Sequence, residues 1–179
     1  MLQGNYFTMN VAIIGASGYT GLELIKILIN HPKFNIAYIA NSSGEMNVQD
    51  LHPCLKNVIN MDVSLANASQ VAKVADLAFL ALPHKTAMSF AKELLNLGVK
   101  VIDLSADYRL ELETYEKHYC EHLDKEHIKD AVYGLPEYFR NEIRNAKLIA
   151  NPGCYPTASL LALLPFIDYI DIDAPIFID

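Results

Sequence analysis

Short apolar runs of strand length alternate along this chain with stretches whose apolar residues recur at helical spacing. In residues 19–30, the side chains of Leu22, Ile25, Leu28 and Ile29 fall on one face of a helix. The pattern predicts strands at 10–14, 34–40, 77–82, 99–105 and 146–150, helices at 19–30 and 87–98, a helix after the turn 151–157, and the start of a strand at 175–179.

This alternation predicts an α/β fold with a doubly wound parallel sheet. Strands that are apolar throughout fit such a sheet, because helices cover both of its faces. Residues 106–145 are richer in Tyr, Glu, His and Lys, and we expect short helices and loops there. Residues 1–8 precede the first strand and are either a leader or a native extension.

A glycine-rich turn separates the first predicted strand from the first predicted helix. Its glycines follow a G-x-x-G-x-x-G spacing. Small residues let the backbone approach a pyrophosphate, and a helix N-terminus offers free N–H groups to it. The strand–turn–helix context favours a nucleotide site over a turn without a ligand. The residues of this candidate site are Gly15, Ala16, Ser17, Gly18, Tyr19, Thr20 and Gly21.

The end of the second predicted strand bears on which nucleotide binds. NAD-binding versions of such folds carry an acidic residue there, which holds the ribose 2′-hydroxyl. Residues 40–44 read Ala-Asn-Ser-Ser-Gly, so no acid precedes Glu45. Ser42 and Ser43 offer hydroxyl groups to a 2′-phosphate, which favours NADP, although the arginine that is usual at such a site is absent.

The turn 151–157 reads Asn-Pro-Gly-Cys-Tyr-Pro-Thr and places a cysteine where a helix begins. Pro156 suits the first helical position, which would leave Cys154 just ahead of the helix. Free N–H groups at a helix N-terminus stabilise a thiolate and an oxyanion formed on it. We therefore favour a nucleophilic Cys154 over a buried structural cysteine, and we interpret Cys54 and Cys120 as structural cysteines.

Two further residues follow predicted strands at the same edge of the sheet. Arg109 is suited to clamp a phosphate or a carboxylate, and a surface salt bridge with Asp107 or a nearby Glu is the alternative. His84 follows the strand 77–82, where it is either a general base or a structural loop histidine.

The composition narrows the choice of partners. A chain of 179 residues with 52% apolar residues can bury a core, and a net charge of −7 without a basic cluster argues against nucleic acid. No apolar run reaches the roughly 18 residues that indicate a membrane helix, and the N-terminus lacks the pattern of a secretory signal. We expect reduced cysteines and a cytoplasmic protein, and no Cys/His spacing indicates a metal site.

Six stretches together resemble N-acetyl-γ-glutamyl-phosphate reductase, an enzyme family of arginine biosynthesis. They occur in order from about Met9 to the end of the chain, and the set is far more specific than any single stretch. The related aspartate-semialdehyde dehydrogenases share a similar glycine turn and an Asn-x-x-Cys motif, but the Gly-Cys-Tyr-Pro form favours the former family. The stretches are VAIIGASGYTGLELIKIL, LHP, FLALPH, VIDLSADYRL, VYGLPE and NPGCYPTA.

The resemblance implies an NADPH-dependent reductive dephosphorylation of N-acetyl-L-glutamyl 5-phosphate, through a thioester on Cys154, to N-acetyl-L-glutamate 5-semialdehyde. It implies that residues 15–21 carry the cofactor pyrophosphate and that Pro83 and His84 line the cofactor cleft. Arg109 and Asn151 would bind the substrate. The implied partners are a small acyl phosphate and, for the full-length protein, further copies of itself in a homo-oligomer.

The resemblance also implies a domain organisation. Residues 9–150 would form an NADP-binding Rossmann-type domain, and 151–179 would carry the cysteine turn, a helix and the start of a second, largely missing α+β domain for catalysis and dimerisation. That second domain holds the family's acid/base histidine, so no histidine of this chain takes that role.

From this organisation we expect the chain to bind NADP, to show negligible reductase activity alone and to expose apolar side chains near its C-terminus. The alternatives are an aspartate-semialdehyde dehydrogenase, a non-catalytic nucleotide-binding domain and an α/β domain without a ligand.

Overall fold

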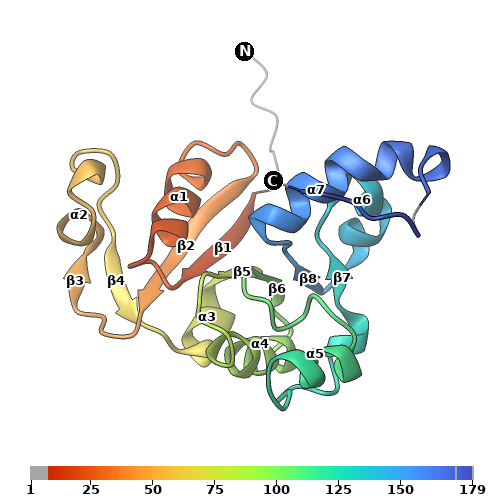
Figure 1. Ribbon diagram of the computed structural model, residues 1–179. Coiled ribbons are helices and arrows are strands. Elements are labelled where there is room, and N and C mark those ends of the chain that lie inside the picture. Colours follow the sequence, from red (N-terminus) through yellow and green to blue (C-terminus); the bar gives the residue numbers. More distant parts are fainter. Residues whose placement is uncertain (1–7, 172, 179) are drawn as a thin grey trace.

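One eight-stranded sheet organises the residues that the structure, a computed structural model, describes, namely 8–171 and 173–178 (Figure 1). The strand order is β3-β4-β2-β1-β5-β6-β8-β7, and every neighbouring pair is parallel except β3 and β4. The doubly wound parallel sheet is therefore confirmed, with one short antiparallel edge. The strands are β1 (Met9–Ile14), β2 (Phe34–Asn41), β3 (Met46–Asn47), β4 (Asp62–Leu65), β5 (Leu77–Leu80), β6 (Lys100–Asp103), β7 (Val132–Tyr133) and β8 (Leu148–Ala150).

Helices cover both faces of the sheet, as the continuous apolar strands predict. In β1, Val11 and Ile13 belong to one buried cluster with Ile25 of α1, whereas Ala12 and Ile14 belong to the other, which includes residues of α3 and α4. The helices are α1 (Tyr19–Leu28), α2 (Val48–Leu51), α3 (Ala68–Val74), α4 (Thr86–Asn96), α5 (Leu112–His118), α6 (Pro136–Asn145) and α7 (Cys154–Leu163), with 3₁₀ turns η1 (Pro53–Leu55), η2 (Ile128–Asp130) and η3 (Leu164–Tyr169).

The order of the strands reverses between β1 and β5. From β1 the chain moves outward through β2 to β4, and it then returns to β5 and continues the other way through β6 to β8. Ligands of doubly wound sheets bind where the strand order reverses, outside the carboxyl ends of the strands. The loops after β1 and β5 flank this switch point.

Several predicted boundaries and two predicted features differ from the structure. The strands predicted at 77–82, 99–105 and 146–150 are shorter, because their outer residues already form the loops at the sheet edge. The strand start predicted at 175–179 is wrong for 175–178, which pair with no other described strand, and residue 179 lies outside the described residues. The leader predicted at 1–8 also lies outside them, apart from Thr8.

The helix after the cysteine turn begins earlier than predicted. Cys154 is its first residue and Gly153 its N-cap, so Pro156 stands at the third helical position rather than the first. Proline is tolerated anywhere in a first turn, because those N–H groups have no intrahelical acceptor.

The region 106–145 contains the expected short helices and also the edge strand β7, which pairs in parallel with β8. The pattern alone assigned no element to residues 45–76, where the structure places β3, α2, η1, β4 and α3. The exposed apolar side chains expected near the C-terminus are present, among them Tyr169 and Phe177. No helix in the described ranges is long and apolar enough to cross a membrane.

The backbone of Gly15 passes very close to the end of β5. Its φ is +93°, and a Cβ added there would lie 2.1 Å from the carbonyl oxygen of Ala81. Only glycine fits this position, because any side chain would overlap backbone and also strain the left-handed conformation.

We expect Gly15→Ala to lower the free energy of unfolding by about 3 kcal/mol or more, since steric overlap adds to the cost of positive φ. Gly98→Ala is the matched control. Gly98 also has a positive φ of +83°, but a Cβ there meets no atom within 4 Å. It should cost only about 1 kcal/mol. Urea unfolding of both variants checks this, and equal losses would contradict the close approach.

Candidate functional site

Five loops meet at the carboxyl edge of the sheet, because parallel strands all point the same way. Each loop directly follows a strand and carries residues singled out in the sequence. They are 15–18 after β1, 42–44 after β2, 81–84 after β5, 104–109 after β6 and 151–153 after β8.

The glycine turn presents unpaired amides at the start of α1. The N–H groups of Gly15 and Ala16 donate to the carbonyl oxygen of Ala40 at 2.9 and 3.0 Å. Gly18 is the N-cap of α1 without a side-chain cap, and within the described residues the N–H groups of Ser17, Tyr19 and Thr20 have no acceptor. These amides are free to bind an anion.

The shape of the turn suits a dinucleotide as well. A Cβ on Gly21 would lie 2.5 Å from the carbonyl oxygen of Gly15, so α1 packs directly against the turn. A Cβ on Gly18 would meet nothing within 4 Å, which leaves the backbone there open to a ligand. The residues present therefore fit a pyrophosphate at this helix N-terminus.

Asn41 occupies the end of β2, where an NAD-binding fold carries its acid. Its Nδ2 donates to the hydroxyl oxygen of Ser17 at 3.0 Å, and its Oδ1 accepts from the N–H groups of Ser43 and Gly44 at 2.9 and 2.6 Å. The side chain thus links the glycine turn to the turn 42–44. Ser42 and Ser43 are exposed, as the cofactor prediction requires.

The cysteine turn places an exposed thiol at a helix N-terminus. Gly153 caps α7 without a side-chain cap bond, and its carbonyl accepts from the N–H and the hydroxyl of Thr157 at 3.0 and 2.8 Å. Pro156 has no N–H, and the N–H groups of Cys154 and Tyr155 have no acceptor in the part of the chain that the structure describes. The alternative of a buried structural cysteine is wrong for Cys154, because it is exposed. The same interpretation is wrong for Cys54, which is also exposed, whereas Cys120 is partly buried.

Arg109 joins the loop after β6 to the cysteine turn. Its Nε donates to the carbonyl oxygen of Asn151 and its Nη2 to that of Leu104, both at 2.7 Å. A Cβ on Gly153 would lie 3.1 Å from Nη1, so the guanidinium rests against the cysteine turn. Nε and Nη2 of the guanidinium are thus bonded to backbone carbonyls, and Nη1 has no acceptor within the described residues. The side chain of Asn151 donates to the carbonyl of Pro152 at 3.0 Å.

His84 is held in one tautomer. Its Nδ1 accepts from the N–H of Ala106 at 3.0 Å, so the proton lies on Nε2, which belongs to a half-exposed side chain. The 3.7 Å approach of Nδ1 to Asp107 is therefore no ion pair. Pro83, beside it, is exposed and its carbonyl oxygen accepts from the N–H of Ala87.

Asp107 caps α4 from outside the helix and makes no salt bridge with Arg109. Its Oδ2 accepts from the N–H groups of Lys85 and Met88 at 2.9 and 3.1 Å, and its Oδ1 accepts from the Tyr115 hydroxyl at 2.7 Å. Lys85 has a φ of +69°, so these bonds stabilise a strained residue next to His84.

A buried polar network supports the loop 104–109 from below. The Tyr108 hydroxyl donates to Asp124 at 2.8 Å, and His122 Nε2 donates to the carbonyl oxygen of Asp107 at 2.8 Å. Burial raises the pKa of the Tyr108 phenol, so it remains a donor at neutral pH. The network fixes Asp107 and Tyr108, the two residues that precede Arg109.

Asp103 ends β6 with a fully buried carboxylate. Its partners are the N–H and the hydroxyl of Ser105, at 3.1 and 2.6 Å. Burial raises its pKa to about 6, and the two bonds from Ser105 limit the rise. Its carbonyl oxygen accepts from the N–H of Asn151 at 2.8 Å. The Asp103 carboxyl, whose ionised form is costly to bury, therefore lies where the end of β6 contacts the cysteine turn.

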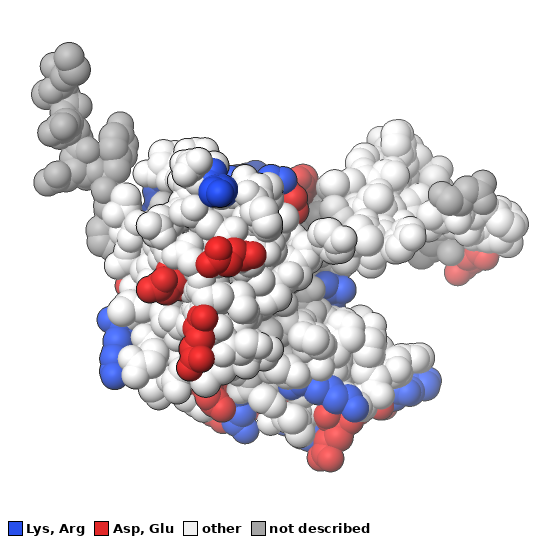
Figure 2. All heavy atoms as spheres, turned by 90° about the vertical axis from the view of Figure 1, so that its left-hand side faces the viewer, with Lys and Arg blue, Asp and Glu red and all other residues white. Residues whose placement is uncertain are grey.

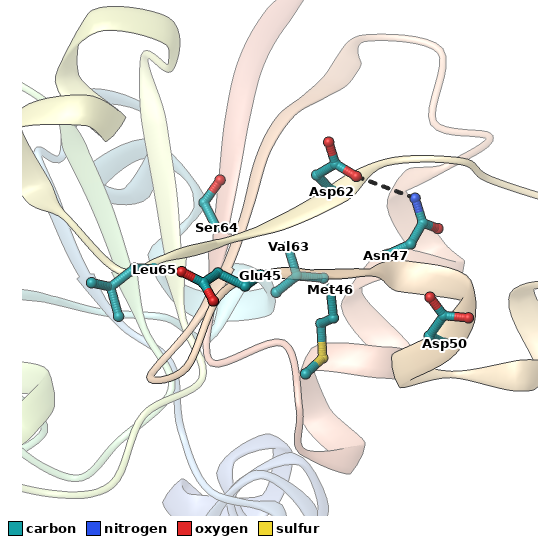
Figure 3. A pocket seen from close by; sticks show the side chains of 8 residues that line it. All are labelled: Glu45, Met46, Asn47, Asp50, Asp62, Val63, Ser64 and Leu65. Carbon is teal, nitrogen blue, oxygen red and sulfur yellow. Dashed lines mark hydrogen bonds between the residues drawn. The ribbon is translucent and has the colours of Figure 1, made fainter.

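A hollow of about 590 Å³ lies at the antiparallel edge of the sheet and adjoins the loop 42–44 through Glu45 (Figure 3). Glu45, Asp50 and Asp62 line it, and Asn47 donates to Asp62 at 3.4 Å. Three carboxylates would repel an anionic cofactor. Within 8–171 and 173–178, no three His, Cys, Asp or Glu side chains are grouped to hold a metal ion. On the face shown in Figure 2, basic and acidic side chains are interspersed.

The sequence profile of the family "Semialdehyde dehydrogenase, NAD binding domain" matches residues 10–146. This chain belongs to that family. Its glycine turn therefore belongs to a nicotinamide-dinucleotide-binding fold.

Relatives named N-acetyl-gamma-glutamyl-phosphate reductase confirm the resemblance seen in the motifs. The protein from Sulfurovum sp. (strain NBC37-1) is 57% identical over 171 residues, which are 96% of this chain and 51% of that protein. The protein from Wolinella succinogenes is 58% identical over 169 residues, or 94% and 50%. The chain spans about half the length of the curated relatives it matches.

Solved structures of aspartate semialdehyde dehydrogenases share the fold. The enzyme of Candida albicans with NADP superposes with a TM-score of 0.68 at 18% identity, over 90% of this chain and 47% of that one. An enzyme of Vibrio cholerae gives 0.63 at 22% identity, over 91% and 47%.

Sequence reasoning missed the residues that hold the site together. Asp107, Asn41 and His52 act through partners that lie 19 to 36 positions away along the chain, and no local pattern marks such pairs. The local sequence gives one signal, at His52-Pro53, because a residue before proline favours an extended backbone.

The buried Asp103 makes stability depend on pH. Folded Asp103 holds its proton more tightly than the unfolded chain, so stability falls as pH rises between about 4 and 6. Asp103→Asn removes this loss. Between pH 4 and pH 7, the free energy of unfolding of the variant should therefore rise relative to that of the native protein by up to about 3 kcal/mol. Urea unfolding at both pH values measures the gain, with the exposed Glu93→Gln as control. A gain independent of pH would contradict the assignment.

Proposed function

We propose that this chain is the cofactor-binding, nucleophile-bearing portion of an NADPH-dependent reductase in arginine biosynthesis. The reductase would convert N-acetyl-L-glutamyl 5-phosphate to N-acetyl-L-glutamate 5-semialdehyde. The observation that carries the proposal is the exposed thiol of Cys154 at the N-terminus of α7, on the same sheet edge as the glycine turn. The named relatives at 57 and 58% identity support it.

We assign NADP to the glycine turn. Residues 15–21 would hold its pyrophosphate, Ser42 and Ser43 its 2′-phosphate, and Pro83 and His84 would line the cleft beyond. The neutral Asn41 supports NADP over NAD, because it replaces the carboxylate that would repel a 2′-phosphate. When bound, NADPH supplies the hydride for the reduction.

Cys154 would act as the nucleophile. Its thiolate attacks the carbonyl carbon of the acyl phosphate, the C–O bond to phosphorus-bound oxygen breaks, and phosphate leaves with the electron pair. A thioester remains. After reduction the C–S bond breaks, the thiolate leaves and the semialdehyde is released. A thiolate suits both steps, because it attacks readily and also departs readily.

The surroundings of Cys154 supply groups for the charges in this reaction. The free N–H groups of Cys154 and Tyr155 would stabilise the oxyanion that forms on the attacked carbonyl. Arg109 Nη1, against Gly153, would attract the phosphate of the substrate, and Asn151 would contribute to its binding. The proposal includes no general acid or base from this chain.

The rival assignment, aspartate-semialdehyde dehydrogenase, is not favoured. Its solved structures are 18 and 22% identical to this chain and therefore argue for the fold alone. We further propose a cytoplasmic protein whose full-length form assembles with further copies of itself.

The cofactor assignment predicts tighter binding of NADP than of NAD. Replacing both hydroxyls, Ser42→Ala with Ser43→Ala, should weaken NADP binding about tenfold or more and leave NAD binding unchanged, because only NADP carries the 2′-phosphate. Gly18→Ala should weaken both dinucleotides without loss of stability, since its Cβ enters open space.

Isothermal titration of each variant measures these affinities, and the exposed Ser69→Ala serves as control. Equal affinity of the native chain for NAD and NADP would refute the choice of NADP. Failure to bind either would refute the cofactor site.

The nucleophile assignment predicts that Cys154 reacts faster with iodoacetamide at neutral pH than Cys54, by about tenfold or more. Both thiols are exposed, but Cys54 lies in a three-residue 3₁₀ turn rather than at the start of a long helix. Peptide mass spectrometry resolves the two sites in one sample, so Cys54 is an internal control. NADP should change the rate at Cys154 only. Equal rates without an effect of NADP would mean that the turn 151–157 is merely packed structure.

A further inference from the structure

His52 reaches the glycine turn from a distant segment of the chain. Its Nε2 lies 2.6 Å from the carbonyl oxygen of Ala16, and its side chain is nine-tenths buried. A carbonyl oxygen only accepts, so Nε2 donates the proton.

The backbone of His52 is itself fixed, so the ring arrives in a set position. The residue lies between α2 and η1 in the extended conformation that the following Pro53 favours. Its N–H donates to the carbonyl of Val48, and its carbonyl accepts from the N–H of Leu55, both at 2.9 Å.

The bond to Ala16 controls a second group through peptide planarity. The carbonyl of Ala16 and the N–H of Ser17 belong to one trans peptide unit and point in opposite directions. Fixing the carbonyl toward His52 therefore aims the Ser17 N–H to the other side. That N–H finds no acceptor in the described part of the chain. Asn41 restrains the same residue from its side chain, through the Ser17 hydroxyl.

We propose that His52 is a positioning residue for an anion at the glycine turn, holding the Ala16–Ser17 peptide so that the Ser17 N–H faces the pyrophosphate. The inference deepens the proposed function, because it takes the cofactor pyrophosphate as the anion. Without the ring, the buried carbonyl loses its donor and the peptide is free to rotate. A rotated peptide turns oxygen instead of hydrogen toward the phosphates.

The test compares His52→Phe, which keeps a ring without the donor, with His52→Gln, which keeps an N–H donor. Inorganic pyrophosphate and NADP are titrated into the native chain and each variant, with the Ser17 amide followed by NMR. In the native chain both ligands should shift this resonance. His52→Phe should lose the shift and bind NADP about tenfold more weakly or worse, and His52→Gln should restore most of both. The exposed His118→Phe is the control.

The outcomes separate this inference from the proposed function. If His52→Phe retains native affinities and the native Ser17 shift, His52 has no positioning role, even if the variant unfolds at a lower temperature. If the native chain binds pyrophosphate at Ser17 but neither dinucleotide, the proposed function fails, and the pyrophosphate titration of the variants still decides the role of His52. If neither ligand shifts the Ser17 amide, both ideas fall.

Discussion

The contact between the Gly15 backbone and the carbonyl of Ala81 is the constraint on which the rest of this structure depends. It brings the exits of β1 and β5 together at the point where the strand order reverses. The glycine turn can then lie at this switch point, where α1 begins with amides that have no acceptor among the described residues. The loops after β6 and β8 follow along the same edge, so the cysteine turn belongs to the same surface.

The sequence was sufficient for the centre of the sheet and insufficient for its margins. Continuous apolar runs such as Val11–Ile14 have only one stable environment, between two layers of helices, and they were predicted well. The edge strands β3 and β7, and β4 next to β3, are short and partly exposed. Pairing with a neighbour, rather than their own pattern, determines them. For the same reason no pattern marked 175–178 as unpaired.

The candidate site divides in a similar way. The residue types that would do chemistry lie in short motifs, and the glycine and cysteine turns could be recognised from their spacing. The hydrogen bonds that orient them come from far along the chain. Arg109 illustrates the difference. The sequence indicated that its side chain binds an anion, whereas in the structure two of its nitrogens donate to the carbonyls of Leu104 and Asn151. The proposed nucleophile is thus held in place by the same side chain that is proposed to attract the substrate.

The packing of Gly153 against the Arg109 guanidinium has an evolutionary consequence. The arginine is tied at two nitrogens and cannot swing away, so a methyl group at position 153 would press on Nη1 at 3.1 Å. A side chain at 153 therefore requires the guanidinium or the turn to shift by a few tenths of an ångström. We expect the residues at 109 and 153 to vary together among homologues, although 44 positions separate them along the chain.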